Sequence, residues 1–259
     1  MTWAMRRRIF ILFIIFIVFG GLTFWHYSAQ IFVTPSCTDG VRNGDETGID
    51  CGGTMCTTMC ATEVRTPTIL WFRSFPVTDT VYNAAALIEN KNNGATRSLP
   101  YEFRLYDKDN ILLARRDGVA VVPPLGRYVI VETGISVGAT KVGATEFSFS
   151  NTPSVWERIP ETVSKLRIGS SSISLDTSGI VPRLSATLTN FSPTIALTNT
   201  VVAAVLYDDQ NNTVNVSKTV VPEFAPNSNT SVTFTWPQAF PRPVARYDIV
   251  PIIDVFHTH

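Results

Sequence analysis

The chain contains the same pattern twice, at a spacing of about one hundred residues, which is too long for a solenoid repeat. Residues 99–110 read LPYEFRLYDKDN and residues 200–211 read TVVAAVLYDDQN. Asn90 precedes the first copy and Asn190 precedes the second, and each copy runs on into a proline-containing turn. A repeat of this length matches one β-sandwich domain. The sequence therefore predicts two tandem sandwiches.

Composition supports strands over helices and argues against a nucleic-acid partner. The 259 residues include 21 basic and 21 acidic residues, and charged residues make up only 16% of the chain. With no net charge, no global field attracts a polyanion. Val, Thr, Ser and Asn are frequent, which is typical of antiparallel sheets with hydroxyl-rich outer faces.

The apolar run near the N-terminus predicts a membrane anchor. Residues 9–25 form an unbroken run of apolar, Gly or Thr residues, roughly 25 Å long as a helix and close to the thickness of a bilayer core. Arg6, Arg7 and Arg8 precede it, so the positive-inside rule places the N-terminus in the cytoplasm and the remainder outside. The alternative is a cleaved signal peptide, but the run exceeds the usual core length and no A-x-A-like site follows. We expect an uncleaved helix over 9–27.

All four cysteines lie within residues 37–60. An even number of clustered cysteines on the exported side predicts two disulfides, and so short a segment has few apolar residues with which to build a core. The alternative is a four-thiolate zinc site, whose usual C-x2-C pairs are absent. Sequence alone leaves the pairing open among three arrangements of Cys37, Cys51, Cys56 and Cys60.

Oxygen-bearing side chains and glycines alternate inside the same segment. Closely spaced oxygen ligands with glycines at sharp turns suit calcium, although the order of residues does not match an EF-hand loop. The alternative is a cluster of surface turns built by Asp, Asn and Gly. The candidate ligands are Asp39, Asn43, Asp45, Glu46 and Asp50, and no other cofactor is expected.

Short strand-like runs follow the cysteine segment. In residues 101–105, Tyr101, Phe103 and Leu105 alternate with Glu102 and Arg104, which predicts one buried and one exposed face. The expected strands of the first sandwich are 69–75, 81–89, 101–106, 111–114, 119–122, 128–135 and 146–149, and those of the second are 166–168, 184–189, 201–207, 213–220, 231–236 and 247–252.

The expected organisation is all-β after a single helix. Because the connection between the sandwiches is short and contains proline, we expect it to be semi-rigid and the two domains to stack end to end. The segments are a cytoplasmic N-terminus 1–8, a transmembrane helix 9–27, a linker 28–36, the cysteine-rich motif 37–60, sandwich one 61–155, a linker 156–162 and sandwich two 163–259.

The sequence offers little for catalysis. Apart from His26 beside the anchor, its histidines are His257 and His259 at the end of the chain, a poor place for a Ser-His-Asp triad. Asp107 and Asp208 begin the two expected hairpin turns, where an Asp side chain normally bonds nearby backbone donors. We therefore expect no enzyme. Trp71, Trp156, Trp236, Tyr106 and Tyr207 are expected to pack in cores or at sandwich edges, with a ligand platform as the alternative.

Two resemblances bear on these expectations. The cysteine segment resembles a short motif of cell-surface and secreted proteins, C-x-D-G-x-x-N-G-x-E-T-x-x-D-C-G-G, which begins here at Cys37 and implies a surface module next to an anchor. The run 103–107, Phe-Arg-Leu-Tyr-Asp, resembles the FxLYD domain, a small β-sandwich of prokaryotic extracytoplasmic proteins. Residues 205–208 are a second, weaker copy, because Val205 stands in place of the Phe. The resemblance implies an immunoglobulin-like sandwich and no catalytic residues.

Together these patterns predict a non-enzymatic, membrane-anchored, extracytoplasmic binding or spacer protein of the cell envelope, in a bacterial host. Its expected partners are the membrane, through one N-terminal helix, and an envelope protein or wall polymer. The alternative function is a cell-wall or carbohydrate-binding surface receptor that uses aromatic side chains as stacking platforms.

Overall fold

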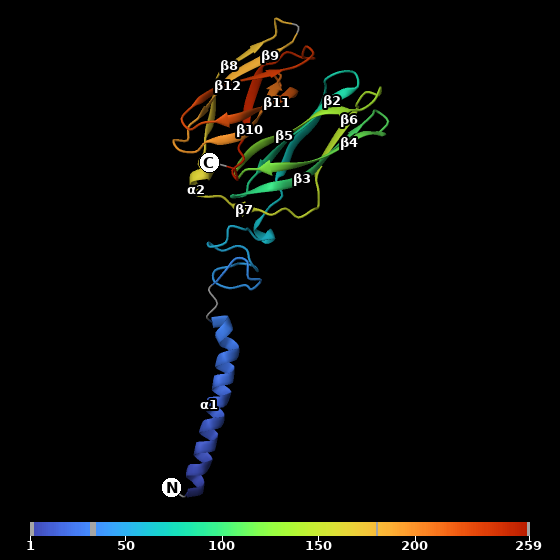
Figure 1. Cartoon of the computed structure of the whole chain (residues 1–259). Coiled ribbons are helices and arrows are strands. Elements are labelled where there is room, and N and C mark those ends of the chain that lie inside the picture. Colours follow the sequence, from blue (N-terminus) through green and yellow to red (C-terminus); the bar gives the residue numbers. More distant parts are fainter. Residues whose placement is uncertain (1–2, 32–34, 180, 258–259) are drawn as a thin grey trace. The chain divides into compact units, whose positions relative to one another are not determined.

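The computed structural model describes residues 3–31, 35–179 and 181–257, and the chain divides into two compact units, Met1–Met55 and Cys56–His259. The first contains one helix, α1 (Trp3–Ile31), and the second contains the strands (Figure 1). Elements of the second unit are η1 (Ala61–Glu63), β1 (Thr68–Pro76), β2 (Val81–Asn90), β3 (Gly94–Tyr106), β4 (Leu112–Val122), β5 (Gly126–Ser136), β6 (Ala144–Phe149), β7 (Glu157–Arg158), α2 (Glu161–Ser164), β8 (Ile168–Asp176), β9 (Arg183–Asn190), β10 (Leu197–Tyr207), β11 (Thr213–Phe224), β12 (Asn229–Thr235) and β13 (Arg246–Ile252).

Helix α1 contains the expected anchor and extends beyond it at both ends. Its stretch Met5–Tyr27 is long and apolar enough to cross a bilayer, since an α-helix rises about 1.5 Å per residue and a bilayer core is about 30 Å thick. An apolar helix near the N-terminus is also compatible with a signal sequence. Part of the predicted linker 28–36, residues 32–34, lies outside the described residues.

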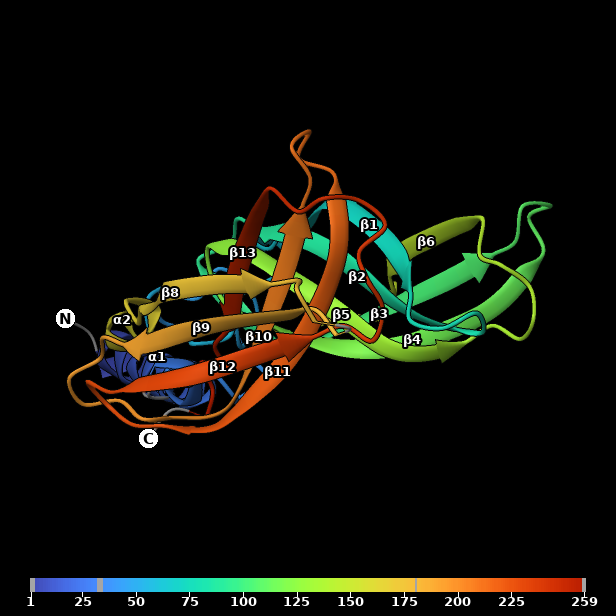
Figure 2. The same ribbon diagram turned by 90° about the horizontal axis from the view of Figure 1, so that it is seen from above.

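The two repeats fold into sandwiches of the same topology. In the first, the sheet β1-β2-β5 faces the sheet β4-β3-β6 across a common core. In the second, β8-β9-β12 faces β11-β10-β13 in the same way. All described strand pairs are antiparallel, and Figure 2 shows β8, β9 and β12 side by side. Leu105 and Leu206 are fully buried, one in each core, as the repeat predicts.

The repeated asparagines hold the ends of strands β2 and β9. The Asn90 side-chain amide donates to the carbonyls of Gly94 (3.1 Å) and Pro123 (2.7 Å). In the second sandwich, Asn190 donates to the carbonyl oxygens of Ile195 and Ala225, at 3.0 and 3.1 Å. Both asparagines are almost completely buried. Each one therefore satisfies backbone acceptors that water does not reach.

The sandwiches pack sheet against sheet, which corrects the prediction that they stack end to end. A third apolar cluster lies between the sheet β1-β2-β5 and the sheet β11-β10-β13. Residues in the middle of β2 and β10 are consequently buried on both faces. The short connection turns the chain back, so that the second sandwich covers the first. The cluster consists of Phe75, Ala85, Val129, Val131, Ala203, Val205, Tyr207 and Val216.

Two further details differ from the predictions. The runs 111–114 and 119–122 belong to one strand, β4, because the polar Arg115–Asp117 stretch between them continues the pairing with β3. Strand β8 overlaps the predicted strand 166–168 at Ile168 alone. The rest of β8 was not predicted, because its run of serines has no apolar alternation. Trp156, the first residue of the predicted linker 156–162, is buried in the first core, as expected for its ring.

Candidate functional site

The cysteine segment is cross-linked as predicted. All four cysteines are disulfide-bonded, so their sulfur atoms are not the thiolate ligands that a zinc site requires. This cross-linking gives order to a segment that contains little regular secondary structure.

The candidate calcium ligands cap local turns. The Asp39 carboxylate accepts from the Val41 amide (2.9 Å) and the Asn43 side chain (2.8 Å). Asp50 accepts with both oxygens from the Gly40 amide, at 3.0 Å each. Among the described residues, no three of the four carboxylates bring an oxygen each within 4.8 Å of one another. These carboxylates are close in the sequence, but each one accepts hydrogen bonds within a separate turn.

The other two acidic residues behave in the same way. Asp45 accepts from both the amide and the hydroxyl of Thr54, and these bonds lower the pKa of Asp45 below its usual range. Glu46 accepts from the Asn43 amide at 3.2 Å. Gly53 lies so close to the Asp45 carbonyl that an added Cβ would stand 2.2 Å from it, so this turn accepts only glycine.

Asp107 and Asp208 build the two hairpin turns, as expected. The Asp107 carboxylate accepts from the amides of Asp109 and Ile111, both at 2.8 Å. Asp208 accepts from the amides of Gln210 (3.0 Å) and Asn212 (2.7 Å). Both carboxylates therefore accept hydrogen bonds from backbone amides and stabilise the turns.

The large aromatic side chains named in the sequence analysis are mostly structural. Trp236 is buried in the second core, and its indole nitrogen donates to the Val216 carbonyl at 3.1 Å. Tyr207 is buried between the sandwiches, and the half-exposed Tyr106 donates to Glu146 at 3.0 Å. Trp236 therefore presents no ring face for stacking. At the chain end, His257 bonds Asp254 (2.7 Å), and His259 lies outside the described residues.

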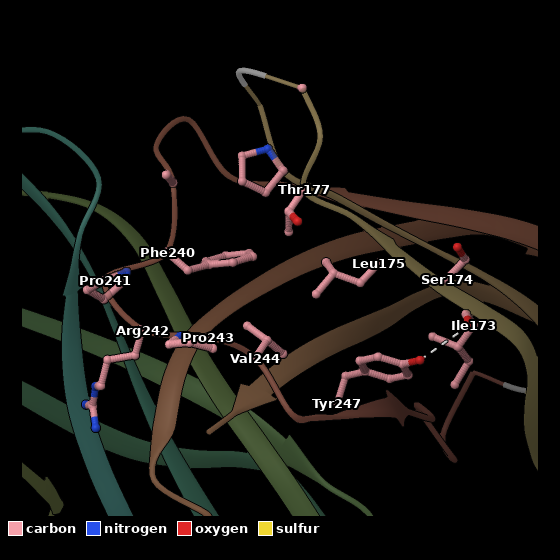
Figure 3. Close-up of a pocket in the computed structure, with 13 residues that line it drawn as sticks. Ile173, Ser174, Leu175, Thr177, Phe240, Pro241, Arg242, Pro243, Val244 and Tyr247 are labelled. Atoms are coloured by element: carbon pink, nitrogen blue, oxygen red, sulfur yellow. Dashed lines mark hydrogen bonds between the residues drawn. The ribbon is translucent and has the colours of Figure 1, made fainter. Parts of the chain in front are cut away.

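A cleft of about 850 Å³ opens in the second sandwich, between strand β8 and the loop that leads into β13 (Figure 3). Apolar side chains from both lips also pack against the second core, so the cleft is an opening into the sandwich interior. Its described lining is Ile173, Ser174, Leu175, Thr177, Gly179, Pro182, Ala239, Phe240, Pro241, Arg242, Pro243, Val244 and Tyr247.

Two aromatic rings come from the loop and from β13. Phe240 packs edge-on against Trp236, with ring centroids 5.2 Å apart, which anchors the ring to the core. Tyr247 reaches across the cleft and donates to the Ile173 carbonyl at 3.4 Å. Figure 3 shows Phe240 and Val244 facing Leu175 across the opening. Apolar side chains thus face one another across the cleft, beside the polar contact of Tyr247 with Ile173.

The loop is tied to the hairpin turn of the second repeat. Arg242 donates to Asp208 at 2.7 Å and points away from Leu175 (Figure 3). The Ala245 amide donates to the Tyr207 carbonyl at 2.8 Å. Burial pushes the pKa of Asp208 up, but the bonds from Asn212 and Gln210 and the Arg242 charge outweigh it, so the pKa is lowered. The guanidinium is thus already paired with a carboxylate.

Sequence reasoning did not single out this cleft, because its residues carry no motif. The one local signal in the sequence is the proline-rich stretch 237–243, which separates β12 from β13. A scan against models of known protein families and a search of curated proteins match nothing in this chain. The structure therefore defines a mostly β-sheet protein with one N-terminal apolar helix and a cleft in its second sandwich.

Proposed function

We propose that this protein is a non-enzymatic, membrane-anchored module of the cell envelope that presents a binding face outside the cytoplasm. The observation that carries the proposal is the combination of a membrane-length helix with two sandwiches, the second of which has a cleft lined by apolar, aromatic and hydroxyl-bearing side chains. The resemblance of both repeats to FxLYD domains supports an extracytoplasmic role in a bacterium.

The orientation follows from charge. Arg6, Arg7 and Arg8 lie at the start of α1, and positively charged flanks stay in the cytoplasm. The cysteine segment and both sandwiches are then exported, where an oxidising environment maintains the disulfides. The partner is an envelope protein or a wall polymer that meets the exposed body.

Protease treatment of intact spheroplasts tests the topology. The exported part should be digested, leaving a small membrane-embedded fragment that contains α1. A cytoplasmic marker protein in the same cells should stay intact, which shows that the membrane is sealed. Protection of the full-length chain would contradict the proposal.

A carbohydrate receptor is the second candidate, and one observation favours it. Phe240 and Tyr247 place two rings in the cleft, and sugar rings stack on aromatic faces. Retention of the detergent-solubilised full chain on purified wall polysaccharide, lost in Phe240→Ala, would support this function. Phe191→Ala is the matched control, because Phe191 is an exposed ring that does not line the cleft.

A further inference from the structure

The internal repeat supplies a comparison for the cleft. Because the two sandwiches share one topology, β1 corresponds to β8 and β6 corresponds to β13. In the first sandwich β1 and β6 lie against one another and close that side. The Thr145 hydroxyl of β6 donates to the Ser74 hydroxyl of β1 at 2.8 Å. The corresponding side of the second sandwich is where the cleft opens.

Two local features keep this side open. The pairing of β8 with β9 shifts register between Ser171 and Ser174, and Ser172 lies in the left-handed region with φ 49°. Such a bulge bends an edge strand. On the other lip, Pro241 and Pro243 keep the loop from pairing as a strand, since proline has no amide donor.

Strand β8 has the properties of an acceptor for another strand. It is the outer strand of its sheet, and its described pairing is with β9. Ile173 and Leu175 are half-buried and line the cleft, while the intervening Ser174 is exposed. An added strand beside β8 would gain main-chain hydrogen bonds, and its inward side chains would enter the cleft and meet Ile173 and Leu175.

The polar groups of the cleft favour a peptide over a sugar. The Arg242 guanidinium is paired with Asp208, and the Tyr247 hydroxyl donates to Ile173. Besides Tyr247, the described lining carries two side-chain hydroxyls, those of Ser174 and Thr177. A sugar needs several fixed side-chain partners for its hydroxyls, whereas a peptide backbone bonds to the edge of β8. Arg242 is the charged residue of the described lining, and it is paired with Asp208, so we expect an uncharged ligand.

We propose that the cleft binds an extended, uncharged polypeptide segment of a partner protein, with apolar side chains at alternate positions, as an added strand beside β8. This inference rests on the proposed function, because it names the partner of the binding face. A segment of about five or six residues matches the usual length of a strand.

The test is a selection of displayed random ten-residue peptides on the full chain in detergent micelles. Ala239 is exposed and lines the cleft, so Ala239→Trp should block the opening without changing the core. Ala139 is an exposed alanine of the corresponding loop in the first sandwich, and Ala139→Trp is the matched control. Selected peptides should alternate apolar and polar residues, bind the wild type and Ala139→Trp equally, and bind Ala239→Trp at least tenfold more weakly.

N-methylation separates strand addition from simple apolar contact. Methylating alternate backbone amides of a selected peptide removes donors and keeps every side chain, so affinity should fall at least tenfold. Equal binding of the methylated peptide would overturn the proposal. So would a selection that enriches nothing over Ala239→Trp, or saturable binding of wall oligosaccharides that Ala239→Trp abolishes. The envelope function is judged separately by the spheroplast experiment.

Discussion

At the scale of single residues, the repeat exposes one strained position. Leu125 has φ 43° and is 63% exposed, and its amide donates to the Asn92 carbonyl at 3.1 Å. Asn227 takes the equivalent place in the second sandwich, with φ 48° and a 2.9 Å bond to the Ser192 carbonyl. The left-handed conformation is costly for leucine and well tolerated by asparagine.

Leu125→Asn should therefore stabilise the protein by about 1 kcal/mol, because the strain is relieved and little buried apolar surface is lost. The free energy of unfolding in urea measures the effect. Asn227→Leu is the matched reverse change and should destabilise by a similar amount. Unchanged stability in both variants would contradict the strain argument.

Asn190 makes the opposite kind of contribution. Its amide donates to buried carbonyls and its oxygen accepts from the Ser192 amide at 3.0 Å. Asn190→Ala should cost roughly 2–4 kcal/mol, since several buried backbone groups lose their partner at once. Urea denaturation of this variant beside Asn229→Ala, at an exposed asparagine, provides the comparison. A loss no greater than that of Asn229→Ala would count against the role assigned to Asn190.

At the scale of elements, the hairpin turn of the second sandwich depends on the ionised carboxylate of Asp208. The pKa of Asp208 lies below its ordinary value of 3.8 in the folded state. Between the folded and unfolded pKa, the unfolded chain binds more protons, so acid favours unfolding. The stability contributed by Asp208 is fully present above pH 3.8 and is lost as the pH falls through the folded pKa.

The wild type should accordingly lose stability as the pH falls below 3.8, and Asp208→Asn should show a smaller loss over the same range. Asparagine keeps an oxygen that can accept from the turn amides but does not titrate. Urea denaturation midpoints at a series of pH values measure both curves. Identical pH dependence in the two proteins would show that this turn carboxylate is not linked to folding.

The sequence predicted only in part which faces of the strands are buried. The alternation in 101–105 correctly predicts that Tyr101, Phe103 and Leu105 of β3 face the core. Glu102, predicted to be exposed, is nevertheless buried, because the side chains of Arg104 and Arg115 pair with it. The unbroken apolar runs of β2 and β10 are the signature of strands covered on both faces. That signature indicates a second covering layer and does not say which part of the chain provides it.

At the scale of the whole molecule, the cluster between the sandwiches should make Cys56–His259 unfold as one cooperative unit. Val205 is fully buried in that cluster. Val205→Asp places a charge there at a cost of several kcal/mol, so one calorimetric transition should become two, one for each sandwich. Val119→Asp, at an exposed valine of β4, should keep the single transition. A single transition in Val205→Asp would show that the sandwiches do not depend on this cluster.

The sequence by itself determined the membrane-length helix, the cross-linked cysteines, the two sandwiches and the hairpin turns, because each arises from local chemistry: apolar length, cysteine clustering, alternation, and Asp beside backbone donors. Only the tertiary structure decided that the sandwiches pack face to face and that one side of the second opens as a cleft. Those features depend on contacts between strands far apart in the chain, such as the hydrogen bond from the Lys218 ammonium to the Val131 carbonyl, and on a bulge near Ser172 that no sequence motif predicts.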